Sequence, residues 1–180
     1  MYSKIEASEE IVFYFKHADL FDDVQHQSAF MCKNIVSKEG EDLLERYAIT
    51  DDERPMYDIC IRETMPDVYD VMKPIMYGIV NAVTDVMNQA DLDTLIGTPS
   101  PTPSSDTYVV VCVQDNGAYN PNDLKNVDTA IRTMIEQGVL SFFYTRVIHP
   151  DLTKMAASMY AANGETLAIR IMPLRRKTRF

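Results

Sequence analysis

Several features that would place this chain in a membrane or secretory class are missing. No apolar run reaches the roughly 18–20 residues that a membrane-spanning helix requires. The first residues, Met1 to Glu6, lack the basic and then apolar order of a secretory signal peptide. Only three cysteines are present, Cys32, Cys60 and Cys112, and each lies among apolar neighbours. Because an odd and scattered set does not make a disulfide framework, we expect reduced core cysteines in an intracellular protein.

Histidine is equally scarce, and the familiar catalytic motifs are absent. None of the three histidines (His17, His26 and His149) lies three or four residues from another histidine or a cysteine, which argues against a structural zinc site. There is no Gly-x-Gly-x-x-Gly, Walker or Gly-x-Ser-x-Gly motif. His149 precedes Pro150 and has no evident nucleophile as a partner, so we interpret it as a helix-boundary residue. The sequence predicts no enzyme, no metal and no cofactor.

Two acidic clusters are candidate cation sites. Asp22-Asp23 and Asp51-Asp-Glu53 supply carboxylates that Ca²⁺ or Mg²⁺ could use. Neither cluster has the alternating oxygen ligands and central glycine of an EF-hand loop. We therefore expect helix capping and solvated surfaces at both places.

Composition and charge describe a globular chain with an unusual end. The chain has 180 residues, 46% hydrophobic and 24% charged, which is typical of one folded domain spanning 1–180. Its formal net charge is −10, yet Arg170–Phe180 contains five bases and no acid, whereas residues 1–96 contain 20 acids and 8 bases. An acidic body with a basic end argues against a general nucleic-acid binder. It is compatible with head-to-tail contact between copies, or with docking onto an acidic partner.

The N-terminal half predicts one strand followed by helices. Ile11–Phe15 is β-branched and aromatic, as strands are. A helical pattern begins at Asp19, and Thr50-Asp-Asp-Glu53 matches a capping box before a long apolar pattern with helical spacing. Pro66 and Pro74 each remove a backbone donor from that pattern, so we expect kinks or restarts there.

The middle of the chain contains a proline-rich loop and one strong strand. Residues 97–106 combine Pro99, Pro101 and Pro103 with serines and threonines, which predicts a semi-extended loop. Thr107–Gln114 is the strongest strand candidate and must pair with another segment. The candidate partners are residues 11–15, residues 79–87 and the region near Leu167. Residues 79–87 are open between strand, which their valines favour, and helix, which their spacing favours.

A well-marked amphipathic helix begins at Asn120-Pro121, an N-cap followed by a first-turn proline. Its apolar stripe is Leu124, Val127, Ile131, Met134 and Ile135, with Asp128, Arg132 and Glu136 outside it. Gly138 is expected to loosen the chain before the dense segment Val139–Tyr144, which should be buried.

A last helix is predicted to begin at His149-Pro150 and to end near Asn163-Gly164. Residues 167–172 are open between a strand and a further helical turn. Residues 174–180 are predicted to form a flexible basic arm containing Arg175, Arg176, Lys177, Arg179 and Phe180. The expected fold class is mainly α: a helical bundle with a small β insertion, either a hairpin or a short sheet, and this arm.

The order of these elements is similar to a known group of virion proteins. The chain begins this order with a capping-box helix (Thr50-Asp-Asp-Glu), an insertion and a strand (Tyr108-Val-Val-Val-Cys112). The Asn120-Pro121 helix, a dense helical segment and a final helix near an Arg/Lys tail come next. This pattern, over roughly residues 20–180, resembles the small helical proteins of the head-to-tail region of tailed phages, especially crAss-like phages. The proline breaks and the proline-rich loop depart from its simplest version.

The resemblance implies a structural function in the virion. Such neck or adaptor proteins form closed rings beneath the portal, commonly twelvefold, and link the capsid to the tail. It implies a homo-oligomer made in the host bacterial cytoplasm, with the portal and adjacent neck or tail proteins as partners, no membrane, and DNA passing through the channel without sequence-specific binding. The candidate interface residues are Arg170, Arg175, Arg176, Lys177, Arg179, Phe180, Pro99, Pro101 and Pro103.

Two other classes stay open from the sequence. One is a different virion component, such as a tail-completion protein or a packaged cargo protein. The other is a non-viral helical interaction or regulatory module. An acidic body and a basic end would serve as complementary contact surfaces in any of these assemblies.

Overall fold

The computed structural model describes the chain except for residues 6–9, 35–45, 76–86, 98–103, 116–119 and 177–180. It is mainly helical with one small antiparallel sheet, which confirms the predicted fold class of a helical bundle with a small β insertion. The elements in chain order are β1 (Tyr2–Ile5), β2 (Glu10–Lys16), α1 (His17–Asn34), η1 (Asp51–Glu53), α3 (Arg54–Met72), β3 (Met87–Asn88), α4 (Gln89–Ile96), β4 (Thr107–Gln114), α5 (Pro121–Val147) and α6 (Pro150–Arg176).

The sheet has the strand order β1-β2-β4-β3, and all neighbours are antiparallel. Of the three candidate partners for the 107–114 strand, the N-terminal segment is confirmed: β2 pairs with β4 from Glu10 opposite Gln114 to Lys16 opposite Tyr108. The region near Leu167 is wrong as a partner because it belongs to α6. Met87 pairs with Tyr108 in β3, and residues 79–86 of the remaining alternative lie outside the described residues.

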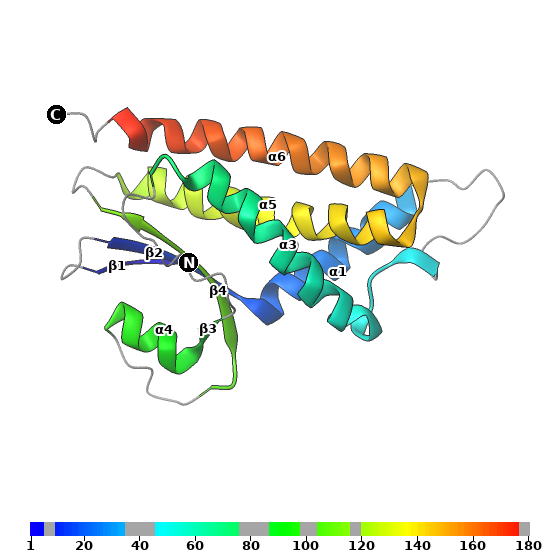
Figure 1. Cartoon of the computed structure of the whole chain (residues 1–180), viewed down its shortest axis with the longest axis horizontal. Helices are drawn as coiled ribbons and strands as arrows, with labels where there is room; N and C mark the ends of the chain where they lie inside the picture. The colour runs from blue at the N-terminus through cyan, green and yellow to red at the C-terminus, as the bar shows by residue number, and fades with distance from the viewer. Residues whose placement is uncertain (6–9, 35–45, 76–86, 98–103, 116–119, 177–180) are drawn as a thin grey trace.

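Both faces of the sheet are covered. Ile11, Phe13 and Phe15 of β2 join the main core beneath the long helices, with alternate residues of β4. On the opposite face Val12 packs with Leu92 of α4 in a second, smaller cluster. Figure 1 shows α4 on one side of the sheet and α3, α5 and α6 on the other. Because both faces of the sheet are buried, the sequence of β4 is a nearly continuous run of apolar residues.

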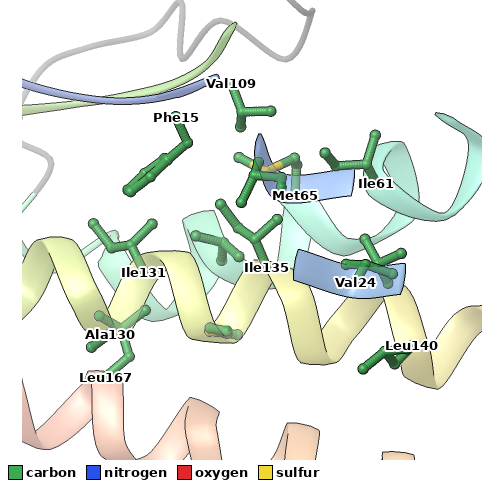
Figure 2. Packing of buried hydrophobic residues seen from close by; sticks show 14 of the residues in the cluster. Phe15, Val24, Ile61, Met65, Val109, Ala130, Ile131, Ile135, Leu140 and Leu167 are labelled. Atoms are coloured by element: carbon green, nitrogen blue, oxygen red, sulfur yellow. The ribbon is translucent and has the colours of Figure 1, made fainter. Parts of the chain in front are cut away.

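Helix α5 is the centre of the helical layer. Its predicted apolar stripe is fully or almost fully buried, and so is most of the dense segment that follows. Ile131 and Ile135 face Phe15 and Val109 from the sheet, whereas Ala130 lies toward Leu167 on α6 (Figure 2). One helix therefore joins the sheet to the outer helix.

Gly138 does not loosen the chain, so that expectation is wrong. Helix α5 runs through it without interruption to Val147. A Cβ atom built at Gly138 would lie under 3.0 Å from Thr64 of α3 and 3.0 Å from the Tyr160 ring of α6. Glycine stands here because two neighbouring helices approach the backbone too closely for any side chain.

Of the two prolines expected to disturb helix α3, Pro74 follows its end and Pro66 does not interrupt it. It continues through Pro66, whose exposed side chain lies on the solvent face, so no restart occurs there. Burial of Met65 and Val68 on the other face holds the helix together, and packing of this kind outweighs one lost hydrogen bond. The helix ends at Met72, just before Pro74, as a proline stop predicts.

Helix α6 is longer than predicted, because it continues past Asn163-Gly164 to Arg176. Leu167 and Ile171, one turn apart, are both buried against the core, and this packing outweighs the helix cost of Gly164. The strand alternative for residues 167–172 is therefore wrong. Residues 174–176 of the predicted arm are helical, while 177–180 lie outside the described residues.

Candidate functional site

The predicted interface residues are divided between the end of α6 and parts of the chain outside the description. Arg170 is exposed on α6, and Arg175 and Arg176 form its last residues. Beyond the described residues lie Lys177, Arg179, Phe180, Pro99, Pro101 and Pro103. The structure thus positions the beginning of the basic stretch, at the end of a long helix.

Two apolar side chains accompany this basic stretch. Ile169 is 61% exposed and Met172 is 48% exposed, on either side of Arg170. Their neighbours Leu167 and Ile171 are buried, so α6 is fixed by one face and presents the other to solvent. Ile169, Arg170 and Met172 are called the C-terminal α6 surface below. Apolar groups beside a cation are typical of contact surfaces between proteins.

An acidic surface lies on α1 and η1. Gln25 Nε2 donates to Asp51 Oδ1 at 3.2 Å, which places η1 beside α1. Asp22 lies one turn before Gln25 and is exposed, as are Asp51 and Asp52. These three residues are called the α1–η1 acidic surface. At its edge the Thr50 N–H donates to Glu53 Oε2 at 2.8 Å, which confirms the predicted capping of the following helix.

A chain of polar side chains joins α1 to α5, and the sequence did not predict it. Arg132 pairs with Asp23 of α1, and its Nε donates to Glu136 Oε1 at 2.9 Å. Gln27 Nε2 donates to Glu136 Oε2 at 2.7 Å, and Gln137 Nε2 donates to Gln27 Oε1. Asp23 is thus not simply a solvated residue of its cluster.

Glu136 was expected outside the apolar stripe, yet it is only 5% exposed. Burial raises the pKa of its carboxyl, while the hydrogen bonds from Arg132 and Gln27 lower it. The only sequence signal for this burial is the position of Glu136 on the helix, directly after the core-facing Ile135. The two glutamines follow no motif, so nothing in the sequence singles them out.

A cavity of about 410 Å³ lies where α1, α5 and α6 meet. Its apolar lining consists of Phe30, Met31, Met155 and Met159, and its polar lining includes Gln27 and Gln137 of the same polar chain. His26 of α1 also lines it. Met31 is buried, whereas Met155 and Met159 are half-buried beside the cavity.

The three cysteines and His149 lie where the sequence places them, in the core and at a helix boundary. Cys32, Cys60 and Cys112 are all buried and none of the three forms a disulfide, as expected of core cysteines. Burial raises the pKa of the Cys60 and Cys112 thiols to about 11, so both stay protonated at neutral pH. His149 Nδ1 accepts the Leu152 N–H at 3.3 Å, which confirms its place at a helix boundary.

The described ranges contain neither a metal-binding cluster nor a membrane-spanning helix. There, no group of three or more His, Cys, Asp or Glu residues could hold a metal ion. Nor does any helix in the same residues combine the length and apolar character needed to cross a bilayer.

Comparison of the chain with protein-family models, curated proteins and solved structures gave no match in any of the three. The chain is therefore interpreted from its own residues. The features available for that purpose are the C-terminal α6 surface, the α1–η1 acidic surface and the cavity.

Proposed function

We propose that this chain is a structural assembly protein of the head-to-tail connector of a tailed phage, where its copies form a ring beneath the portal and link capsid to tail. The observation that carries the proposal is the separation of charge along the chain. Residues 1–169 contain 27 acids and 12 bases, whereas residues 170–180 contain five bases and no acid. Opposite charges on one chain favour association between copies when they lie on different surfaces.

The placement of the two surfaces supports a head-to-tail arrangement. In Figure 1 the C-terminal end of α6 lies at one end of the long axis, whereas α1 and the first turn of α3 lie in the other half. Contacts between two different surfaces are heterologous, and they produce a ring when the rotation between subunits closes. The C-terminal α6 surface of one copy would bind the α1–η1 acidic surface of the next.

The excess of acids over bases in residues 1–169 also suits a connector channel. A negatively charged wall repels the phosphate backbone, so DNA would pass without sequence-specific binding. The portal and the adjacent neck or tail proteins would occupy the two open faces of the ring. The virion, assembled in the host cytoplasm, is its expected location.

Electron microscopy tests the proposal, on the purified chain and on the native particle that contains it. We expect rings in the purified sample, or a ring density of this chain at the head-to-tail junction of the particle. Light scattering on a concentrated sample supplies the mass. A strict monomer in solution, together with no density at that junction, would contradict the proposal.

Matched variants test the contact surface. The double variant Ile169→Asp/Met172→Asp places charge on the C-terminal α6 surface and should abolish oligomers. Ile59→Asp is the control, because Ile59 is 47% exposed on a different helix, α3. Equal loss of oligomers in both variants would mean that the effect is not specific to α6.

A further inference from the structure

The cavity between α1, α5 and α6 presents apolar side chains to solvent. Its volume is about 410 Å³, and its lining includes Phe30 of α1 with Met155 and Met159 of α6. Phe30 is 65% exposed, and the two methionines are half-buried. Because methionine is unbranched and flexible, it adapts to the shape of an apolar partner. Exposed apolar side chains around a hollow are typical of a contact surface between proteins.

One end of this cavity is basic. Cys32 Sγ of α1 lies 3.6 Å from Tyr144 Oη of α5, and Thr153 Oγ1 of α6 donates to the Tyr144 carbonyl oxygen at 2.8 Å. The end of α1 and the beginning of α6 therefore lie at the same level of α5. Lys33 and Lys154 directly follow Cys32 and Thr153, and both are exposed. The two lysines thus lie at the Tyr144 end of the cavity.

The other end is acidic. Asp23 of α1 pairs with Arg132, which lies about three helical turns before Tyr144 on α5. Its neighbour Asp22 is exposed, one turn before His26, which lines the cavity. A partner in the cavity therefore meets positive charge at one end and negative charge at the other.

The end of α6 has the complementary order of residues. Glu165 is exposed one turn before Ile169, and Ile169 and Met172 are the exposed apolar residues of the C-terminal α6 surface. Arg170 lies between them, and further bases follow from Arg175. An acid, two apolar side chains and then a group of bases thus follow one another along this helix.

The C-terminal α6 surface cannot enter the cavity of its own chain. Ile169 lies on the same uninterrupted helix as Met159, about 15 Å further along the axis. Figure 1 shows α6 running along the long axis of the molecule, so its two ends lie far apart. A partner with this surface must be a second copy.

We propose that the cavity of one copy receives the C-terminal α6 surface of the next copy. Ile169 and Met172 of the incoming helix would pack against Phe30, Met155 and Met159. The inference rests on the proposed function, from which it takes the C-terminal α6 surface, and it adds the apolar surface that receives it beside the α1–η1 acidic surface.

The charges give the direction of the incoming helix. Glu165 would lie toward Lys33 and Lys154, whereas Arg170 and the bases after it would lie toward Asp22. The incoming helix is then parallel to the α6 of the copy that receives it. Successive copies are therefore arranged head-to-tail, and such heterologous contacts produce a ring when the rotation between copies closes.

Two charge variants of the full chain test the contact, with association measured by light scattering over a series of concentrations. Phe30→Glu and Met172→Lys each place one charge in the apolar contact, and each should weaken association about tenfold or more. In Phe30→Glu/Met172→Lys the two opposite charges meet across the contact within a Debye length, about 10 Å at 0.1 M salt, so association should recover. Phe30→Glu/Met172→Glu brings like charges together and should associate more weakly than Phe30→Glu alone.

Ile59→Glu is the matched control, because Ile59 is an exposed apolar residue of α3 outside the cavity lining. It should associate as the wild type does. Circular dichroism verifies that each variant folds. If Phe30→Glu does not fold, His26→Glu takes its place, since His26 is an exposed residue of the same lining.

Four results would overturn the inference. If the wild-type chain stays monomeric at every concentration, the cavity does not receive a second copy; density of this chain at the head-to-tail junction of the native particle then decides the proposed function separately. If the chain associates but Phe30→Glu has wild-type affinity, or Ile59→Glu loses as much, the cavity is not the contact and the proposed function stands. If Phe30→Glu weakens association and Met172→Lys does not, something other than the C-terminal α6 surface occupies the cavity. Equal association of the two double variants would show that the two surfaces do not meet.

Discussion

At the scale of single residues, the packing of the helical layer requires a glycine at position 138. Gly138 lies mid-helix, where glycine normally costs about 1 kcal/mol relative to alanine. Its backbone contacts the Thr64 side chain of α3, which is fully buried and donates to the Cys60 carbonyl at 2.9 Å. Thr64 therefore has no freedom to move away from an added methyl group.

Gly138→Ala should lower the free energy of unfolding by about 1–3 kcal/mol, because overpacking outweighs the gain in helix propensity. Gly164→Ala on α6 is the matched control, since its added Cβ would meet only Met134 Cε at 3.8 Å. That control should raise the free energy of unfolding by about 0.5–1 kcal/mol. Urea unfolding of both variants measures the difference. Stabilisation by both substitutions would contradict the close approach.

His17 is a buried titratable group at the junction of β2 and α1. Its side chain is 9% exposed and lies edge-on to the Tyr57 ring, with Asp58 Oδ1 at 3.7 Å from its Nε2. Burial lowers the pKa of the imidazole, although Asp58 partly offsets this effect. The folded chain thus holds His17 neutral more strongly than the unfolded chain does.

A lowered pKa in the folded state means that the unfolded state binds the proton first. The stabilisation is complete above about pH 6.5, the unfolded value, and is lost as the pH falls through the folded pKa. His17→Phe keeps the ring contact with Tyr57 and cannot titrate. The melting temperature of the wild type should therefore fall relative to that of His17→Phe between pH 7.5 and 5.5. Parallel pH profiles would show that His17 contributes nothing to this dependence.

At the scale of elements, local patterns identified most boundaries and missed those decided by packing. The capping signal at Thr50 and the Asn120-Pro121 start are local, and Asn120 Oδ1 accepts the Asn122 N–H at 3.0 Å as that signal predicts. Helix α6 continues beyond Gly164 for a non-local reason, the burial of Leu167 against α5. The pairing of β2 with β4 across about a hundred residues is equally non-local, so the sequence left several partners open.

The α1–α5 junction shows why the candidate cavity could not be predicted. Its polar chain alternates between two helices that are separated by about a hundred residues in the sequence. Glutamine has no periodic signature, and methionine on an inward position indicates ordinary core. Only the three-dimensional arrangement of α1, α5 and α6 brings Gln27, Gln137 and the methionines around one space.

The ion pair between Arg132 and Glu136 has an energetic consequence at this junction. Arg132→Met leaves the Glu136 carboxylate buried with only Gln27 as its remaining described partner, and should cost about 1–3 kcal/mol. The double variant Arg132→Met/Glu136→Met removes the buried charge as well and should be more stable than Arg132→Met alone. Denaturant unfolding of the two variants tests this order. If the double variant is the less stable one, Glu136 contributes favourably without its arginine.

At the scale of the whole molecule, the composition predicts one globular domain. The arrangement of copies in an assembly depends on where the charged surfaces lie in the fold. The net charge of −10 conceals an acidic body and a basic end, and the structure places the first part of that end, through Arg176, on helix α6. A helix that carries its contact residues at fixed positions loses less conformational entropy on binding than a free segment does.

Mixing two variants tests whether assembly is head-to-tail. In one variant Asp22→Asn/Asp52→Asn removes the charge of the α1–η1 acidic surface, and in the other Ile169→Asp/Arg170→Glu disables the C-terminal α6 surface. Each variant alone should be monomeric by light scattering. Their mixture should give a dimer of two 20.5 kDa chains and nothing larger, because only one pair of intact surfaces remains.

The control for this experiment is Asp70→Lys, which reverses an exposed charge on α3 outside the α1–η1 acidic surface and should leave assembly unchanged. A symmetric contact through one self-complementary surface would behave differently. The variant with that surface intact would then form dimers by itself, and mixing would add no new species. Because the two arrangements give different masses before and after mixing, light scattering alone separates a heterologous ring contact from a symmetric one.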